Sequence, residues 1–332
     1  MATLIAFDRS FVEAYPLDEA RHQINRRMGF DIGYSLGADL SSVILGLSLL
    51  PPEDKELVAS FARILQQGRV GHRYRIFLDR NAFPADVDCT AVAAHALHEQ
   101  GLIPPDDYVA IARELLLAAT PKDGQAGAAV LRPAVVRVYW DDGRESDTLI
   151  RGHKYDPVAC ANALCVLKQA RRLGLMGGDH VVAATQRYVS EHLLSQAYRQ
   201  GTRYYPYADA FLHAVSRLVK DFPDCRESLM PQLAEAIVER DAGPGADADD
   251  DRESALNVAL RALAARNIGL GDNDRLRQRA LLEQQQPDGA WPASPYFTLG
   301  RLPVYFGSRL LSTLFAAHAL RPSHGGNHHD RS

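Results

Sequence analysis

The most constraining feature of this sequence is a kind of helix start that recurs along the chain. A polar or aromatic residue opens each one, and a run rich in alanine and leucine follows. Such runs begin near residues 88, 156, 204, 254 and 305. Because these segments are apolar on more than one face, the helices they form are expected to be buried.

Amphipathic segments lie between the small-residue helices and expose charged side chains on one face. These segments are 179–194, 227–239 and 274–285. Periodicity gives roughly twelve helices along the chain. The alternation of buried and exposed helices indicates an inner and an outer ring of helical hairpins. The sequence therefore predicts an all-α fold, an α/α-barrel of roughly six helical hairpins.

The barrel is expected to form a single domain over residues 1–321. The chain has 332 residues, 46% of them hydrophobic, which is enough to bury a large core. Residues 121–154 form the longest stretch without a helical pattern, and they contain a strand-like run at 135–140. Long irregular segments are often functional, so this one is expected to form part of a pocket mouth. Residues 322–332 are expected to be a disordered tail.

Charge and cysteine usage narrow the functional classes. The net charge of -4 and the lack of a Lys/Arg block argue against nucleic acid as a partner. The four cysteines form no CxxC pair and read as reduced thiols of a cytoplasmic protein. The N-terminus does not resemble a signal peptide. The apolar stretch 32–50 contains Asp39, three glycines and several serines, so it predicts a buried helix rather than a transmembrane segment. Peripheral membrane contact is left open.

The most distinctive motif is Asp-Val-Asp-Cys-Thr-Ala at residues 86–91, at the start of one small-residue helix. A helix N-terminus stabilises an ionised carboxylate. Two neighbouring carboxylates such as Asp86 and Asp88 do not ionise together easily, so one pKa should rise. A carboxyl group that stays neutral can protonate a weak base such as an alkene. An ordinary N-cap explains the same residues, and spacing alone favours that interpretation.

The run at 86–91 resembles the Asp-x-Asp-Asp-Thr-Ala signature of class II terpene cyclases and, more closely, the Asp-Cys-Thr-Ala form of oxidosqualene cyclases. The run Gln-Pro-Asp-Gly-Ala-Trp at 286–291 is similar to the Gln…Gly-x-Trp repeat of the same superfamily, which includes squalene-hopene cyclases. The resemblance implies an α/α-barrel cyclase in which Asp88 is the proton donor and Asp86 and Cys89 tune its pKa. It also implies that Trp291 is structural and ties outer helices together.

Members of this superfamily usually contain two barrels, whereas this chain has length for one. The expected reaction is therefore cyclisation of a small isoprenoid, preferably a short prenyl chain as its diphosphate, rather than of squalene. A diphosphate would make Mg²⁺ a candidate cofactor, although the sequence shows no convincing metal site.

Three groups of residues are expected to bind this substrate. In a barrel, the starts of the inner helices meet at one end, which would bring Asp156, Asp209 and Arg309 close to Asp88. A basic cluster before the motif could hold a diphosphate, because guanidinium groups bind phosphate oxygens in a fork. Its members are Arg69, His72 and Arg73, with Arg309 added from the last helix. Aromatic rings stabilise carbocations, and about half of the candidates are expected to be core. These candidates are Tyr139, Trp140, Tyr205, Tyr207, Phe211, Trp291, Tyr296, Tyr305 and Phe306.

Several alternatives remain at this point. Asp247-Ala248-Asp249-Asp250 matches Asp-x-Asp-Asp literally, but Gly and Pro precede it, which is typical of a mobile acidic loop. A protein-prenyltransferase-like barrel would use Zn²⁺, yet no Cys and His fall in a ligand pattern. A glycoside-active barrel would use two carboxylates, for instance those of Asp88 and Asp156. A non-catalytic isoprenoid-binding barrel would need no acid, since fold does not imply function.

Overall fold

The computed structural model describes residues 39–78, 83–119, 132–145, 151–242, 253–301 and 305–322, and the backbone of residues 23–25. Eleven α-helices lie within these residues. They are α2 (Ser41–Leu47), α3 (Lys55–Gln67), α4 (Val87–Glu99), α5 (Pro105–Leu117), α6 (Pro157–Arg172), α7 (Asp179–Leu194), α8 (Ala208–Asp221), α9 (Pro223–Asp241), α10 (Ala255–Ile268), α11 (Asp274–Glu283) and α12 (Arg309–Leu320).

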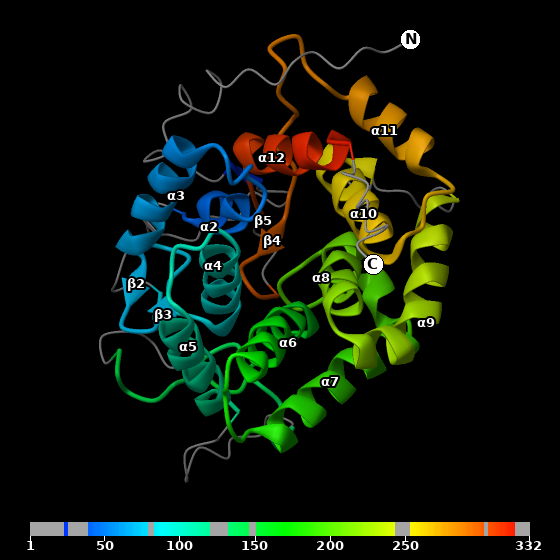
Figure 1. Cartoon of the computed structure of the whole chain (residues 1–332). Helices are drawn as coiled ribbons and strands as arrows, with labels where there is room; N and C mark the ends of the chain where they lie inside the picture. The colour runs from blue at the N-terminus through cyan, green and yellow to red at the C-terminus, as the bar shows by residue number, and fades with distance from the viewer. Residues whose placement is uncertain are drawn as a thin grey trace, which may run out of the picture.

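The helices form two concentric rings (Figure 1). The even-numbered helices α2 to α12 each contact the next, and α12 contacts α2, so the inner ring closes. The odd-numbered helices α3 to α11 each pack outside the inner helix that precedes them. This arrangement confirms the predicted all-α fold with alternating inner and outer helices.

The burial of side chains follows from the sequence pattern of each ring. Nearly every side chain of α10 is buried, and alanine accounts for five of its fourteen residues. In contrast, α11 buries only Arg277 and Leu281 and exposes its remaining side chains at least in part. The indole of Trp291, which is fully buried, donates from Nε1 to the carbonyl of Leu281 at 2.7 Å. Its backbone N–H donates to Thr313 of α12 at 3.1 Å. Trp291 thus joins an outer helix to an inner one.

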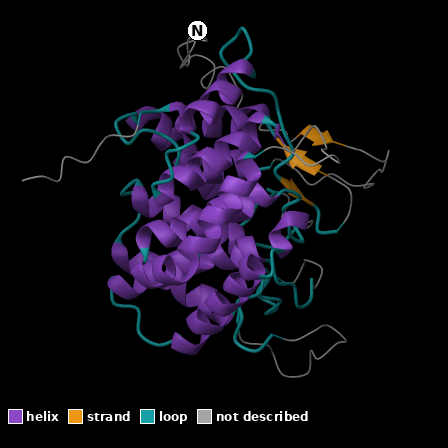
Figure 2. Ribbon diagram, turned by 90° about the vertical axis from the view of Figure 1, so that its right-hand side faces the viewer, coloured by secondary structure: helices purple, strands orange, loops and turns teal. Residues whose placement is uncertain are grey.

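Short strands gather at one end of the rings (Figure 2). One antiparallel sheet has the order β1 (Gln23–Asn25), β5 (Tyr305–Gly307) and β4 (Phe297–Thr298). The other contains β2 (Arg69–Val70) and β3 (Arg73–Tyr74). The prediction that residues 305–311 open a helix is therefore wrong at its start. The helix begins only at Arg309, where the hydroxyl of Ser308 caps it by accepting from Leu311 N at 3.0 Å.

The segment 135–140 belongs to no helix or strand, so its strand-like pattern is misleading. Val138 N donates to Lys154 O at 2.8 Å, and Val138 O accepts from Val87 N at 2.8 Å. The segment is thereby fixed against the first residue of α4. As predicted for an irregular segment, it lies beside a cavity, which Val138 and Tyr139 help to line.

Two predictions fall outside the described residues, namely the acidic run at 247–251 and all but the first residue of the tail at 322–332. The division into one domain over residues 1–321 stays a prediction. Within the described ranges, no helix combines the length and apolar character needed to cross a bilayer.

Candidate active site

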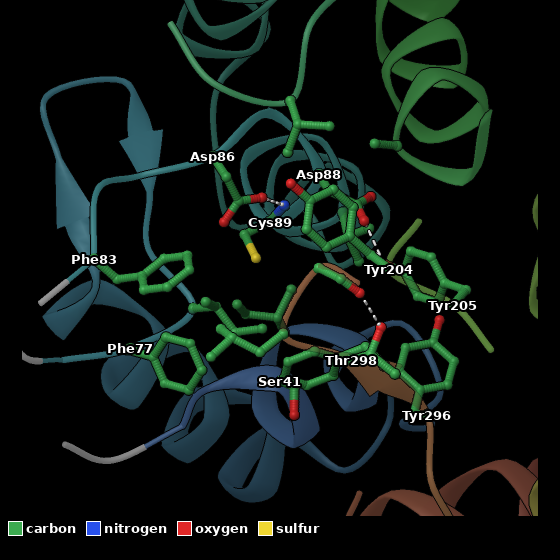
Figure 3. A pocket seen from close by; sticks show the side chains of 18 of the residues that line it. Ser41, Phe77, Phe83, Asp86, Asp88, Cys89, Tyr204, Tyr205, Tyr296 and Thr298 are labelled. Atoms are coloured by element: carbon green, nitrogen blue, oxygen red, sulfur yellow. Dashed lines mark hydrogen bonds between the residues drawn. The ribbon is translucent and has the colours of Figure 1, made fainter. Parts of the chain in front are cut away.

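A cavity opens at the end of the barrel where the inner helices start. The space between its walls is about 700 Å³, including the part open to solvent. The wall comes from the starts of α2, α4 and α6, from residues 76–77, 83 and 138–139, and from the segments before α8 and α12. Figure 3 shows Asp86 and Asp88 on one side, with Phe77, Phe83 and Tyr296 around the remaining wall. Most lining side chains are aliphatic or aromatic.

Asp86 is the N-cap of α4. Its carboxylate accepts from the backbone N–H of Cys89 at 2.8 Å, which satisfies one of the free donors at the helix start. The side chain is buried, and burial together with the nearby charge of Asp88 raises the pKa of Asp86 to about 7. The capping role therefore belongs to Asp86, which leaves Asp88 free for another one.

Asp88 lies in the first turn of α4 and lines the cavity. Its Oδ2 accepts a short hydrogen bond from the hydroxyl of Tyr205, and its Oδ1 accepts from Asn162 Nδ2 at 2.7 Å. Burial raises the pKa of Asp88, while these two hydrogen bonds and the charge of Arg217 oppose the rise. Asp88 is thus a carboxyl group held from two sides, with desolvation favouring its neutral form.

Cys89 also lines the cavity beside the two carboxyl groups. Burial, followed by the charges of Asp86 and Asp88, raises the pKa of the Cys89 thiol well above its usual value. The thiol is therefore neutral at physiological pH and adds a weakly polar group to the wall.

Four tyrosines line the cavity: Tyr139, Tyr204, Tyr205 and Tyr296. The rings of Tyr205 and Tyr296 meet edge to face, with centroids 5.3 Å apart. Burial raises the pKa of Tyr205 well above its usual value, so its hydroxyl is a neutral donor to Asp88.

Asp156 supports this wall without lining it. It caps α6 by accepting from Val158 N at 2.9 Å, and its second oxygen accepts from Tyr204 N at 3.2 Å. Burial raises the pKa of Asp156 to about 6. Thr298 N donates to Tyr204 O at 2.7 Å from the opposite side. The segment that carries Tyr205 is therefore anchored both to α6 and to β4.

Phenylalanines build another part of the wall. Phe77 and Phe83 meet edge to face at 5.2 Å, and Phe297 stacks on Phe306 at 4.7 Å. Three of these rings line the cavity, whereas Phe306 lies behind Phe297. Of the four, only Phe306 was expected from the sequence to belong to the wall.

Several predicted binding residues contribute to packing between the rings. Asp209 is buried in ion pairs with Arg240 of α9 and Arg261 of α10. Phe211 stacks on Tyr198 at 6.2 Å, and Tyr207 is buried directly before α8. These side chains extend from the start of α8 without lining the cavity. Tyr305 likewise lies in β5, paired with Thr298, rather than in the lining.

The predicted basic cluster does not line the cavity either. Arg73 is buried in ion pairs with Glu114, at 2.7 Å, and with Asp142, and its guanidinium lies 4.2 Å from the ring of Trp140. Arg309 pairs with Asp288. The lining also omits Arg69 and His72, and it contains no Lys, Arg or His among the residues that the structure describes.

The most informative side chain that sequence reasoning missed is Asn162. It interrupts the small-residue run at 159–164, and a single amide in a buried helix needs hydrogen-bond partners. That requirement was a usable signal. Across the described ranges, no group of three or more His, Cys, Asp or Glu side chains could hold a metal ion.

Comparisons with known proteins agree with this architecture. No protein-family model matches the chain. Drimenol cyclase drtB of Aspergillus calidoustus is 27% identical over 249 residues, which is 74% of this chain and 40% of that protein. The chain therefore spans less than half the length of this curated relative.

Solved structures of the type II terpene cyclase MstE from Scytonema have the same fold. The apo form matches with a TM-score of 0.60 at 13% identity, over 91% of this chain and 94% of that one. The form with geranylgeranyl dihydroxybenzoate, its substrate, matches at 0.58 and 14%, over 91% and 93%. The form with merosterolic acid A, its product, matches at 0.55 and 16%, over 91% and 92%. The solved structures confirm that this chain has the fold of class II terpene cyclases. Its sequence is also similar to that of a terpene cyclase.

Proposed function

We propose that this chain is a class II-type terpene cyclase that starts carbocation cyclisation of a linear isoprenoid with the proton of Asp88. The observation that carries the proposal is the position of Asp88, a partly desolvated carboxyl group on the wall of an apolar, aromatic cavity. An acid that stays neutral near physiological pH is what protonation of an alkene requires.

The first step moves one proton. The terminal alkene uses its π electron pair to form a C–H bond with the proton of Asp88, and the O–H bonding pair stays on the carboxylate. The neighbouring carbon becomes a tertiary cation, which further double bonds attack in turn. An epoxide substrate would instead take the proton on oxygen and open its C–O bond. The final cation loses a proton from carbon, or adds water and then loses a proton from the new oxygen, and solvent returns a proton to Asp88.

The cavity wall supports the later cations. Aromatic faces stabilise a desolvated cation by about 2 kcal/mol or more, and Phe77, Phe83 and Tyr296 contribute rings to the wall. The neutral Tyr205 and Cys89 provide no strong base near the first cation.

The substrate class follows from size and polarity. We prefer a short prenyl chain that carries a diphosphate, as predicted from the sequence, because the cavity is lined mostly by apolar side chains. The relative is called a drimenol cyclase, and MstE takes a prenylated dihydroxybenzoate, so diphosphate and other head groups both need to be tried. Mg²⁺ stays a candidate only for a diphosphate, and a role of Arg69, His72, Arg73 or Arg309 in its binding stays a prediction.

The test is to incubate the purified chain with geranyl, farnesyl and geranylgeranyl diphosphates, and with the matching alcohols, with and without Mg²⁺. Products are extracted, dephosphorylated and analysed by gas chromatography with mass spectrometry. Cyclic products that retain the substrate's oxygen function, and that disappear with Asp88→Asn, would support the proposal. Binding without conversion of any linear isoprenoid would instead indicate a non-catalytic barrel.

A further inference from the structure

Three side chains from three consecutive inner helices form a row that ends at Asp88. Arg217 of α8 donates from Nη1 to Asn162 Oδ1 at 3.1 Å. Asn162 of α6 donates from Nδ2 to Asp88 Oδ1 at 2.7 Å. Since α8 contacts α6 and α6 contacts α4, the row crosses the inner ring from helix to helix.

The direction of the two hydrogen bonds is fixed by Arg217. A guanidinium has donors and no acceptor, so the amide of Asn162 must present its carbonyl oxygen to Arg217. Its NH₂ group must then point at Asp88, to which it can only donate. Without Arg217 the amide could turn over and offer its oxygen to Asp88 instead.

This direction decides which oxygen of Asp88 can hold the proton. In a neutral carboxyl group the carbonyl oxygen is the stronger acceptor, so a fixed donor at Oδ1 favours Oδ1 as the carbonyl oxygen. At Oδ2 the partner is the hydroxyl of Tyr205, which can donate or accept. A proton on Oδ2 is therefore compatible with both neighbours.

We propose that Arg217 is a positioning residue which, through Asn162, keeps the transferable proton on Oδ2 of Asp88. This inference rests on the proposed cyclase function. When the proton leaves Oδ2 for the alkene, the carboxylate that remains keeps its bonds from Asn162 and Tyr205. Arg217 also stabilises this carboxylate by its charge, and so it makes Asp88 a stronger acid.

The charge of Arg217 is distinctive in these surroundings. The other titratable groups facing Asp88 come from α4, from α6 and from the segments before α8 and α12. They are Asp86, Cys89, Asp156, Cys160, Tyr205 and Tyr296. Arg217 is the one permanent cation among these described groups. The groups that face Arg217 itself are Glu99, Tyr108, Cys165, His213 and Tyr296.

The experiment compares the pH dependence of kcat/KM for Arg217→Gln and the wild type, on whichever linear isoprenoid the wild type converts. Activity needs a protonated Asp88, so it falls as pH rises through the pKa of that group. Loss of the positive charge should move this alkaline limb to higher pH by about 0.5–1 unit, less than a directly contacting charge would cause. The plateau rate should fall about 10- to 100-fold, part of what general acid catalysis supplies.

Two further variants test the mechanism. Arg217→Lys keeps the charge, so its alkaline limb should stay near that of the wild type and part of the rate should return. Asn162→Leu breaks the row, so adding Arg217→Gln to it should cost little more rate, because the two residues act as a unit.

Arg266→Gln is the matched control, since Arg266 is an inner-helix arginine that donates to the backbone carbonyl of His318 at 3.3 Å. It should lower Tm and leave the pH profile unmoved. If Arg217→Gln behaves in the same way, or if the losses of Arg217→Gln and Asn162→Leu multiply, the positioning role is refuted. A wild type that converts no linear isoprenoid would refute the proposed function instead.

Discussion

At the scale of single residues, Asp88 accepts hydrogen bonds from Tyr205 and Asn162. Its contribution to the folded structure and its contribution as a proton donor can therefore be tested separately. Asp88→Asn keeps the shape and loses the proton. Turnover should fall below detection, because general acid catalysis supplies about 10²–10⁴-fold and an unactivated alkene depends on it more strongly. Tm should stay close to that of the wild type. Product formation and thermal unfolding of the purified variant measure the two effects.

Asp86→Asn and the acidic run provide the controls for that prediction. Asp86→Asn should reduce activity less, since its role is to influence the pKa of Asp88. Asp249→Asn and Asp250→Asn should have little effect. An active Asp88→Asn variant together with an inactive Asp249→Asn variant would transfer the acid role to the run at 247–251.

The raised pKa of Asp86 should also make the stability of the protein depend on pH. Its pKa is about 7 in the folded protein, against about 3.9 for an unfolded aspartate. As pH rises from about 4 to 7, the unfolded state loses its proton first, so the free energy of unfolding decreases. Asn caps a helix nearly as well as Asp, so Asp86→Asn should avoid this loss. At pH 8 the variant should be more stable than the wild type by on the order of a few kcal/mol.

Urea unfolding at pH 4.5 and pH 8 measures this difference. The gain in stability of Asp86→Asn should be small at pH 4.5. At that pH Asp86 is largely neutral in the folded wild type, and the asparagine that replaces it carries no charge. Asp106→Asn is the matched control, because Asp106 is an exposed aspartate in the first turn of α5. It should gain nothing at pH 8. Equal or lower stability of Asp86→Asn at pH 8 would show that Asp86 is ionised without penalty.

Residue roles were predictable where a local pattern carried them. Asp86, Asp88 and Cys89 were identified from six consecutive residues, and all three line the cavity. Asp209 has the same local setting as Asp88, near the start of a small-residue helix, yet it turns toward Arg240 and Arg261. The difference arises from where the partner arginines lie on α9 and α10, which one helix start does not encode.

At the scale of elements, helices were predictable and the connections between them were not. The segment 179–194 coincides with α7, whose apolar periodicity is local and whose start is marked by Gly178 at its N-cap. In contrast, Tyr305–Gly307 became a strand, because it pairs with β4 and β1 across the barrel end. Gly307 is required there, since a Cβ would lie 1.8 Å from the carbonyl oxygen of Ser294. Such tertiary pairing leaves no mark in local periodicity.

The turn before α8 offers an element-scale prediction. Gly201 has φ of +72°, and a Cβ on it would lie 2.5 Å from the carbonyl oxygen of Tyr205. Gly201→Ala should therefore displace the Tyr204–Tyr205 segment and weaken the hydrogen bond from Tyr205 to Asp88. We expect kcat to fall by about 10-fold or more, part of the general-acid contribution, with a moderate loss of Tm. Steady-state kinetics and thermal unfolding measure both.

Gly269→Ala separates this effect from backbone strain alone. Gly269 has φ of +77° at the end of α10, and nothing lies within 4 Å of a Cβ there. The variant should lose about 1–2 kcal/mol of stability from its left-handed conformation and keep its kcat. If both variants keep full activity, the position of Tyr205 is not critical to the reaction.

At the scale of the whole molecule, the cavity exists only when the ring closes. Its wall extends from Ser41 to Gly300 in sequence. Closure depends on α12 meeting α2, where Ser308 and Ser42 share a hydrogen bond and Gly46 admits the side chain of Leu314. Alternating helix types predicted this ring. Of the segment 296–300, only Tyr296 was predicted as wall, because the place of the rest depends on a hydrogen bond from Thr298 to Tyr204 across the barrel.

The last prediction concerns chain length and belongs to the cavity as a whole. Leu299 lines the cavity, is partly exposed and lies outside any helix or strand, so a larger side chain there should narrow the cavity without disturbing the core. Leu299→Trp should lower kcat/KM for a geranylgeranyl substrate more than for a geranyl one, because a longer chain fills more of the cavity. Close contact between the indole and the substrate should make the loss of transition-state binding differ by about 1–3 kcal/mol between one chain length and the next.

The measurement is kcat/KM for geranyl, farnesyl and geranylgeranyl substrates with one shared head group. Leu276→Trp is the matched control, since Leu276 is 64% exposed on the outer helix α11, and it should leave the length preference unchanged. A loss that is equal for all three lengths would mean that Leu299 affects a step common to them, such as the position of Asp88. A preference that shifts toward shorter chains would show that the cavity between α4 and the segment 296–300 holds the prenyl chain during cyclisation.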